Sequence, residues 1–172
     1  DGALLAFSVI LQGDRSESQL TELLTKIALD MEEDGTWDNS SMRTTLADWA
    51  AEKELDGKMP TIRRNVTNWG LSSIVPNFEK HIHKFWTTEY GLGSCTTDNE
   101  GEILQNTNDQ SKSNGTYFIC KSGWWTTASI IEIDTYQWEP STDGDVRSGD
   151  CNMGNCYVFE NNAWRSGNAD DC

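Results

Sequence analysis

Two short runs of sequence, Tyr117-Phe118-Ile119-Cys120 and Tyr157-Val158-Phe159, decide the fold of the second half of this chain. They begin forty positions apart, and each is followed by a polar turn and then by tryptophan, at Trp124 and Trp164. An acidic residue followed by glycine precedes each run, at 100–101 and 143–144. Recurrence of this kind is the signature of a repeated supersecondary unit, so we expect two copies of one module. The two spacings differ by three, which predicts three extra residues in the Asn106–Asn114 loop of the first copy.

Each copy has the pattern of a β-hairpin. In the first, the strands Tyr117–Cys120 and Trp124–Ala128 are separated by three residues that include glycine, a connection typical of hairpins. The residues that follow each acidic-glycine pair, 101–104 and 144–147, would add a third strand to each copy. Between the copies, Ser129–Asp134 could be a further strand or an extended linker.

The first 91 residues have the periodicity of helices instead. Apolar residues recur at three- and four-residue spacing in five segments, and serine, proline and glycine stand where helices begin and end. In the fourth segment the spacing places Ile62, Val66 and Trp69 inward. The composition changes at Gly91-Leu92-Gly93-Ser94. We therefore predict an α+β chain, with a helical bundle at 1–91 and two repeated antiparallel β-hairpin units at 95–172, divided into 95–138 and 139–172.

The composition limits the partners of the chain. The net charge is −15 over 172 residues, and both halves are acidic. Such a surface repels phosphate backbones and anionic lipid, so we expect no nucleic-acid partner. No apolar run reaches the length that a membrane-spanning helix needs, and we expect no membrane insertion in this segment.

All of the cysteines lie in the loop-rich second half, at Cys95, Cys120, Cys151, Cys156 and Cys172. None of them forms the paired C-x-x-C spacing of a zinc site. Cysteines gathered in such a region favour disulfides and an oxidising compartment. The sequence thus predicts an extracellular or cell-surface location.

The segment Leu92-Gly93-Ser94-Cys95, the acidic-glycine pair, the Tyr117–Cys120 run and Trp124 together resemble repeats in large secreted or surface lipoproteins of Fibrobacter and related fibre-degrading bacteria. Asp134-Thr135-Tyr136-Gln137-Trp138 looks like the same arrangement opening again, and the helical part is similar to the region that precedes those repeats. The resemblance implies a cell-envelope or extracellular setting and brings no catalytic residue with it.

The second copy lacks cysteine at the positions that match Cys95 and Cys120. If Cys95 and Cys120 form a disulfide, we expect both cysteines to be missing together from a copy that lacks the bridge. Cys151 and Cys156 are close enough in sequence to bridge a local loop. Cys172 is then unpaired, and the family pattern would make it the first cysteine of a further copy.

Tryptophans are the best candidates for ligand contacts. If Trp124 and Trp125 lie in a strand, they point to opposite faces. Because Arg165 stands at the position that matches Trp125, we expect Trp124 and Trp164 to be the core pair. Trp125 is then either an exposed platform for a sugar ring or a residue packed against the helices. Trp138 and Arg165 complete the candidate ligand-binding set.

Other chemistry has weaker support. His81 and His83 diverge on a helix, so they cannot share one metal ion, and we expect both to be exposed. Oxygen-rich loops at Asn106, Asn108 and Asp109, and at Asp143, Asp145 and Asp150, make Ca²⁺ conceivable, although solvated turns explain them as well. No other metal or cofactor is indicated.

We therefore predict a non-catalytic extracellular surface or adhesion module that binds plant-wall polysaccharide through exposed tryptophan. One alternative is a structural spacer of a larger surface lipoprotein with no ligand. Another is a glycoside hydrolase with a carboxylate pair, which needs at least one carboxyl of raised pKa. An exposed row of tryptophans favours the first hypothesis, and full burial of Trp124, Trp125, Trp138 and Trp164 favours the second.

Overall fold

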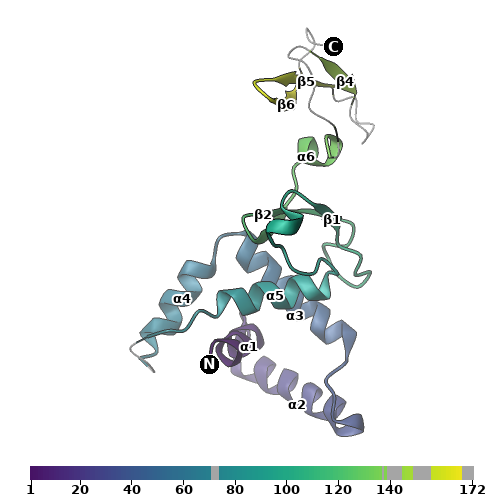
Figure 1. Ribbon diagram of the computed structural model, residues 1–172. Helices are drawn as coiled ribbons and strands as arrows, with labels where there is room; N and C mark the ends of the chain where they lie inside the picture. The colour runs from purple at the N-terminus through teal and green to yellow at the C-terminus, as the bar shows by residue number, and fades with distance from the viewer. Residues whose placement is uncertain (71–73, 137, 139–144, 149–155, 168–172) are drawn as a thin grey trace.

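A computed structural model describes residues 1–70, 74–136, 138, 145–148 and 156–167 of the chain. This part has an α+β fold with six α-helices, one short 3₁₀ helix and two three-stranded antiparallel sheets (Figure 1). The bounds in chain order are α1 (Gly2–Gln12), α2 (Glu17–Asp34), α3 (Ser40–Leu55), α4 (Met59–Asn68), α5 (Glu79–Glu89), η1 (Thr97–Asn99), β1 (Ile103–Gln105), β2 (Tyr117–Lys121), β3 (Trp124–Thr127), α6 (Ile130–Asp134), β4 (Val146–Ser148), β5 (Cys156–Glu160) and β6 (Ala163–Ser166).

The predicted helix signals act as expected at α2. The Ser16 side chain accepts from the backbone N–H of Gln19, whose own side chain accepts from the backbone N–H of Ser16. This capping box satisfies two N–H groups that have no partner inside the helix. At the other end Gly35 adopts a left-handed conformation with φ 82°, which glycine reaches without steric cost.

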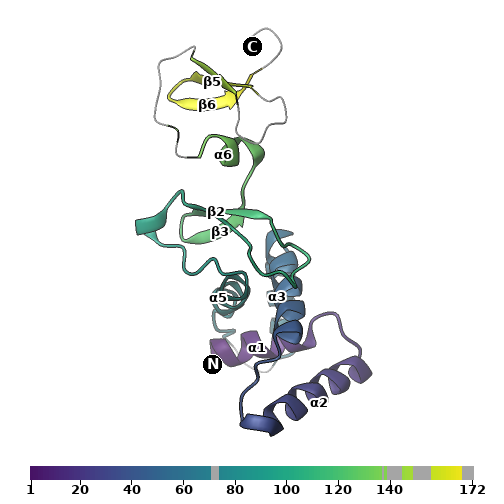
Figure 2. The same ribbon diagram turned by 90° about the vertical axis from the view of Figure 1, so that its right-hand side faces the viewer.

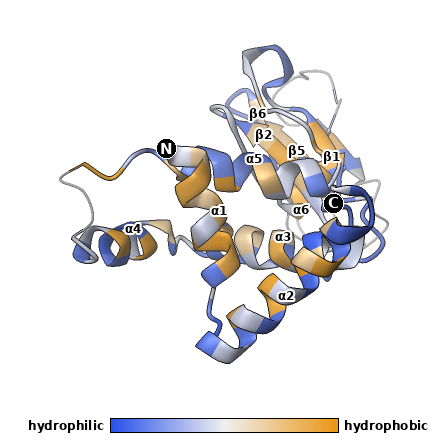
Figure 3. Cartoon of the chain, turned by 90° about the horizontal axis from the view of Figure 1, so that it is seen from below, coloured by the Kyte–Doolittle hydropathy of each residue, from blue (hydrophilic) through white to orange (hydrophobic). Residues whose placement is uncertain are grey.

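The helices bury one core around α5. Its residues Ile82 and Trp86 are 0% exposed, and α5 packs along α3 and across α1 (Figures 1 and 2). Helix α1 is apolar over most of its length (Figure 3), and its buried face contributes Ala6, Val9 and Ile10. Burial of large side chains of this kind is the main stabilising contribution to such a small fold.

The first sheet, β1–β2–β3, shares this core. Phe118, Cys120 and Trp125 lie in the same buried cluster as the helical residues. Successive strand residues point to opposite faces, so Ile119 points to the other side, where it packs with Ile103. Because both faces of β2 are covered, three consecutive residues of this strand are buried.

The other face of the first sheet is covered by the segment around α6. Ala128, Ile133 and Tyr136 pack against Ile103 and Ile119. The two interpretations of Ser129–Asp134 as a strand or an extended linker are therefore wrong, because these residues form a short helix. The sequence did contain a signal for the start of this helix, because Ser129 and Glu132 form a capping box.

The second sheet, β4–β5–β6, follows α6 in the sequence. It lies at the end of the molecule that is farthest from α1 and α2 (Figure 2). The Tyr157 hydroxyl donates to Asp134 of α6 at 2.5 Å, and both residues are 1% exposed. On this sheet the guanidinium of Arg147 lies 5.1 Å from the ring of Trp164 and 5.5 Å from that of Trp138. Its cation–π contacts join the strand β4 to both tryptophans.

The strand register shows how the two sheets correspond. Each hairpin turns through two residues with positive φ, Ser122-Gly123 in the first sheet and Asn161-Asn162 in the second. This conformation is the favoured connection of two antiparallel strands. Cys120 pairs with Trp125, and Phe159 pairs with Trp164, so Trp125 and Trp164 occupy the same place 39 positions apart.

The sequence pattern matched Trp124 with Trp164, forty positions apart. In the strand register the residue that corresponds to Trp164 is instead Trp125, one position further along the chain. A displacement of one residue moves a strand side chain to the opposite face. The expected core pair is accordingly wrong. Trp124 is 40% exposed, whereas Trp125 is 1% exposed and belongs to the core.

One disulfide joins Cys95 and Cys120, which confirms the predicted pair. It ties the segment after α5 to the central strand of the first sheet. Cys156 is also disulfide-bonded. Its predicted partner Cys151 and the predicted unpaired Cys172 both lie outside the described residues.

Candidate ligand-binding groove

The three predicted ligand-binding residues do not form one site. Trp125 packs against the helices, the second of the two alternatives considered for it, and at 1% exposure it offers no platform. Its indole N–H donates to the carbonyl of Gly93 at 3.1 Å. Arg165 belongs to strand β6 of the second sheet, and Trp138 packs against this sheet from the segment after α6. Trp138 is half-buried against Trp164, with 4.9 Å between ring centroids, and Arg165 donates to Glu160 at 2.8 Å.

The expected exposure of the histidines is wrong, because His81 is half-buried and His83 is buried. His83 is 8% exposed, and its Nδ1–H donates to Glu54 Oε1 at 2.6 Å. The other Glu54 oxygen accepts from the indole N–H of Trp86 at 2.9 Å. His83 Nε2 accepts from the backbone N–H of Trp125 at 3.4 Å. Both ring nitrogens are thus occupied, and the imidazole joins α3, α5 and β3 as a structural group.

The oxygen-rich Asn106–Asn114 loop lies against α3 through Asp48. One oxygen of this carboxylate accepts from Tyr90 at 2.9 Å and from Ser111 at 2.6 Å, and the other accepts from the backbone N–H of Lys112 at 3.0 Å. Burial, together with the hydrogen bond to Asp48, raises the pKa of Tyr90 to about 12. The Asn106–Asn114 loop is therefore a docking element between the first sheet and the helices.

The same loop uses its side-chain oxygens internally. Asn106 Oδ1 accepts from the backbone N–H of Asn108, and Asn108 Oδ1 accepts from that of Gln110. Within the described residues, no group of three or more His, Cys, Asp or Glu side chains is placed to hold a metal ion. The second proposed Ca²⁺ loop, at Asp143, Asp145 and Asp150, lies outside the described residues apart from Asp145.

A hydrolase would need a carboxyl that stays protonated near neutral pH. Four carboxyls, those of Asp14, Glu22, Glu79 and Glu132, have a pKa below its usual value. A lowered pKa favours the ionised form, which is opposite to what a general acid requires. These four groups therefore give no support to the carboxylate-pair hypothesis.

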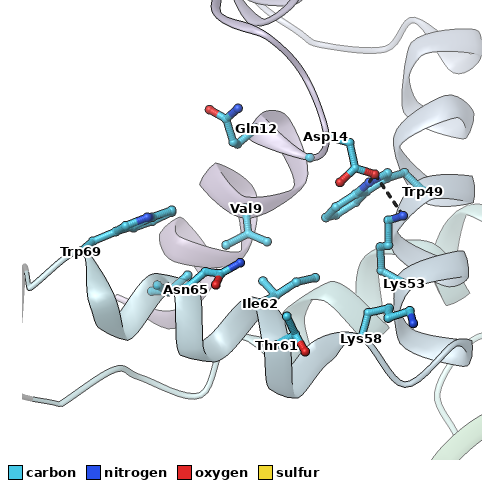
Figure 4. A pocket seen from close by; sticks show the side chains of 12 residues that line it. Val9, Gln12, Asp14, Trp49, Lys53, Lys58, Thr61, Ile62, Asn65 and Trp69 are labelled. Atoms are coloured by element: carbon cyan, nitrogen blue, oxygen red, sulfur yellow. Dashed lines mark hydrogen bonds and ion pairs between the residues drawn. The ribbon is translucent and has the colours of Figure 1, made fainter.

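A groove of about 320 Å³ opens between α1, α3 and α4. Figure 4 shows the indole of Trp69 at one end and that of Trp49 at the other, with the side chains of Val9 and Ile62 between them. Trp69 is 49% exposed and Trp49 is half-buried. The groove thus has an apolar floor and two aromatic ends.

Polar groups of several kinds border this floor. The amide side chains of Gln12 and Asn65 and the hydroxyl of Thr61 line the groove and are exposed. They can donate or accept hydrogen bonds. A concave apolar surface with a few polar groups is the usual composition of a ligand site.

An ionic contact orients the Trp49 end. Asp14 Oδ2 accepts from the Trp49 indole N–H at 3.0 Å and lies 3.0 Å from Lys53 Nζ. Hydrogen bonds from Lys53 and Trp49 hold the pKa of Asp14 below its usual value. The hydrogen bond to Asp14 also raises the pKa of Lys53. Asp14 therefore stays charged and holds the Trp49 ring in place.

Helix α4 forms the opposite wall and is held by Arg63. The guanidinium donates to both oxygens of Glu79 at 2.6 Å and to the carbonyls of Val75 and Pro76 at 3.1 Å. It also lies 5.1 Å from the ring centroid of Phe78. A bidentate contact fixes the geometry of its two partners. Arg63 thus connects α4 to the start of α5 and sets the position of this wall.

The groove was not among the sites predicted from the sequence, because the apolar spacing of the fourth helical segment places Trp69 inward. The expectation that Trp69 points inward is wrong, since half of its surface is exposed. Trp69 continues the apolar stripe of Ile62 and Val66, and only Val66 of these three is buried. The sequence did contain one signal for the exposure of Trp69. The apolar stripe ends at this tryptophan, which stands beside Gly70 at the end of a ten-residue helix.

No family model matches this chain, and no curated protein or solved structure gives a significant match. Functional inference therefore rests on the groove itself. Within the described residues, no helix has the length and apolar character to cross a bilayer.

Proposed function

We propose that this protein is a non-catalytic extracellular binding module that holds a plant-wall polysaccharide in the groove between α1, α3 and α4. The observation that carries the proposal is the pair of indoles, Trp49 and Trp69, at the two ends of one apolar floor. The C–H faces of a pyranose ring are apolar and flat, and they fit the face of an indole. Ring hydroxyls would meet the amides and the hydroxyl at the border.

The extracellular setting is supported by the disulfides. Cys95 is joined to Cys120, and Cys156 is disulfide-bonded as well. Disulfides persist in oxidising compartments and are rare in cytosolic proteins. The strongly acidic surface also suits a neutral ligand better than a polyanion.

The proposal is tested by retention on insoluble cellulose and xylan. We expect the native chain to be retained on at least one of them and Trp69→Ala to be released. Loss of a central tryptophan contact costs roughly 2 kcal/mol or more, which is about 30-fold in affinity. Because Trp69 is 49% exposed, its replacement should leave the fold intact.

Trp124→Ala is the matched control, since Trp124 is 40% exposed and lies on the first sheet outside the groove. We expect this variant to be retained like the native chain. Failure of the native chain to bind either polymer would overturn the proposed function. Release of Trp124→Ala with retention of Trp69→Ala would move the site away from the groove.

We also propose that the chain is a helical bundle followed by two copies of one β unit. Equal strand order, equal antiparallel pairing and the same two-residue turn in both sheets support a duplication. The first copy shares its core with the helices, so 1–138 should fold without the second sheet. A chain that ends at residue 138 and lacks cooperative unfolding would contradict this arrangement.

A further inference from the structure

The charges that line the groove differ in sign from those of the rest of the protein. The chain carries −15 overall, yet two lysines and one aspartate, Lys53, Lys58 and Asp14, line the groove. Figure 4 shows Lys53 and Lys58 close to each other at the Trp49 end. Two lysines thus lie together at this end of the groove, although the chain as a whole is strongly acidic.

The two lysines are not equivalent. Lys53 Nζ lies 3.0 Å from Asp14 and 3.1 Å from Glu52, so carboxylates already balance its charge. Lys58 forms no ion pair within the described part of the chain, and its side chain is exposed. An uncompensated ammonium at the edge of an aromatic groove can attract an anionic group of the ligand.

The backbone places Lys58 at this edge. Helix α3 ends at Leu55, and Gly57 reverses the chain with φ 67°. The backbone N–H of Lys58 then donates to the carbonyl of Lys53 at 2.8 Å. Lys58 thus stands in the turn that joins the two helices forming the walls of the groove, in a position set by the backbone.

We propose that the ligand is a glycan of mainly neutral sugars that carries occasional uronic-acid groups, and that Lys58 binds the uronic carboxylate. This inference rests on the proposed function. Indole faces fit the apolar C–H faces of pyranose rings, and one free ammonium matches one carboxylate. A polymer charged on every sugar does not fit, because the remaining surface of the protein would repel it.

The test compares two soluble probes by calorimetric titration: a linear xylo-oligosaccharide and the same oligosaccharide with one glucuronic acid substituent. An exposed ion pair contributes modestly, so we expect the acidic probe to bind about two- to five-fold more tightly at low ionic strength. The difference should disappear in 0.5 M salt, because salt screens exposed charges.

Lys58→Gln should abolish the preference, so that this variant binds the acidic and the neutral probe equally. Lys112→Gln, which removes an exposed lysine outside the groove, should keep the preference. Equal binding of both probes to the native protein would overturn this inference and leave the proposed function standing. A preference that survives Lys58→Gln would also overturn it. If neither probe binds, this inference fails, and retention on cellulose and xylan then decides separately whether the proposed function stands.

Discussion

The buried His83 and the half-buried Glu54 form a hydrogen-bonded pair, 2.6 Å from Nδ1 to Oε1, that fastens the first sheet to the helices. The second carboxylate oxygen holds Trp86, and the second imidazole nitrogen accepts from the backbone of Trp125. One carboxylate thus serves two N–H donors, and one imidazole connects two helices to a strand. The cluster explains why α3, α5 and β3 adopt a single arrangement.

The first prediction concerns this carboxylate. Glu54→Gln leaves one acceptor oxygen for two donors, so either His83 Nδ1–H or the Trp86 indole N–H faces an amide NH₂ group. An unsatisfied buried donor costs about 1–3 kcal/mol, and the free energy of unfolding in urea should fall by that amount. Glu52→Gln is the control, since the side chain of Glu52 is 60% exposed. Equal stability of the two variants would show that the cluster contributes nothing.

A second prediction follows from the register of the first sheet. Trp125→Ala removes a side chain that is 1% exposed, and it should lower the free energy of unfolding by about 3–5 kcal/mol. Trp124→Ala removes a side chain that is 40% exposed and should cost less than about 2 kcal/mol. Thermal unfolding of both variants gives the order, and the reverse order would contradict the register described here.

The third prediction concerns the bridge between Cys95 and Cys120, which are separated by 25 residues. On the chain-entropy model a loop of this size stabilises the fold by about 3.5 kcal/mol, so the double variant Cys95→Ala/Cys120→Ala should lose roughly that much. The double variant is preferable to a reducing agent, which would also open the disulfide of Cys156. A loss below about 1 kcal/mol would show that the bridge does not constrain the unfolded chain.

A fourth prediction concerns pH and the wall of the groove. Burial opposes the ionisation of Glu79, but the hydrogen bonds from Arg63, backbone hydrogen bonds at the start of α5 and the charge of Arg63 together outweigh it, and the pKa of Glu79 lies below its usual value. A carboxyl with a lowered folded-state pKa stabilises the fold above the unfolded pKa, about 4.3, and loses this contribution as the pH falls through the folded pKa. Between pH 6 and pH 3 the native chain should therefore lose more stability than Glu79→Gln. Parallel stability curves would contradict the role of the Arg63–Glu79 contact.

Local signals in the sequence predicted the helical half well. The five helices of 1–91 follow from apolar spacing and from caps such as Ser16 and Gly35, because these features act within a few residues. The Cys95–Cys120 disulfide was likewise predictable, since both of the positions that the sequence pattern matches to these cysteines lack cysteine. The turn at Ser122-Gly123 was predicted as a three-residue connection and is a two-residue turn. That difference of one residue exchanged the expected positions of Trp124 and Trp125.

The groove could not be predicted because it depends on contacts between distant segments. Periodicity places Trp69 on the apolar face of α4, but it does not say how far a neighbouring helix covers that face. The orientation of α4 is set by Arg63 and Glu79, sixteen residues apart. The burial of His83 similarly depends on Glu54, 29 residues away, and on the first sheet, so its helical position alone gave the wrong expectation.

The most direct test of the central claim is a titration of ¹⁵N-labelled protein with a xylo-oligosaccharide, observed at the indole N–H signals of the eight tryptophans. Single Trp→Phe variants assign the signals of Trp49, Trp69 and Trp124. We expect Trp49 and Trp69 to shift with one common binding curve, while Trp124 stays unchanged. Unchanged signals of Trp49 and Trp69 at saturating oligosaccharide would contradict the account.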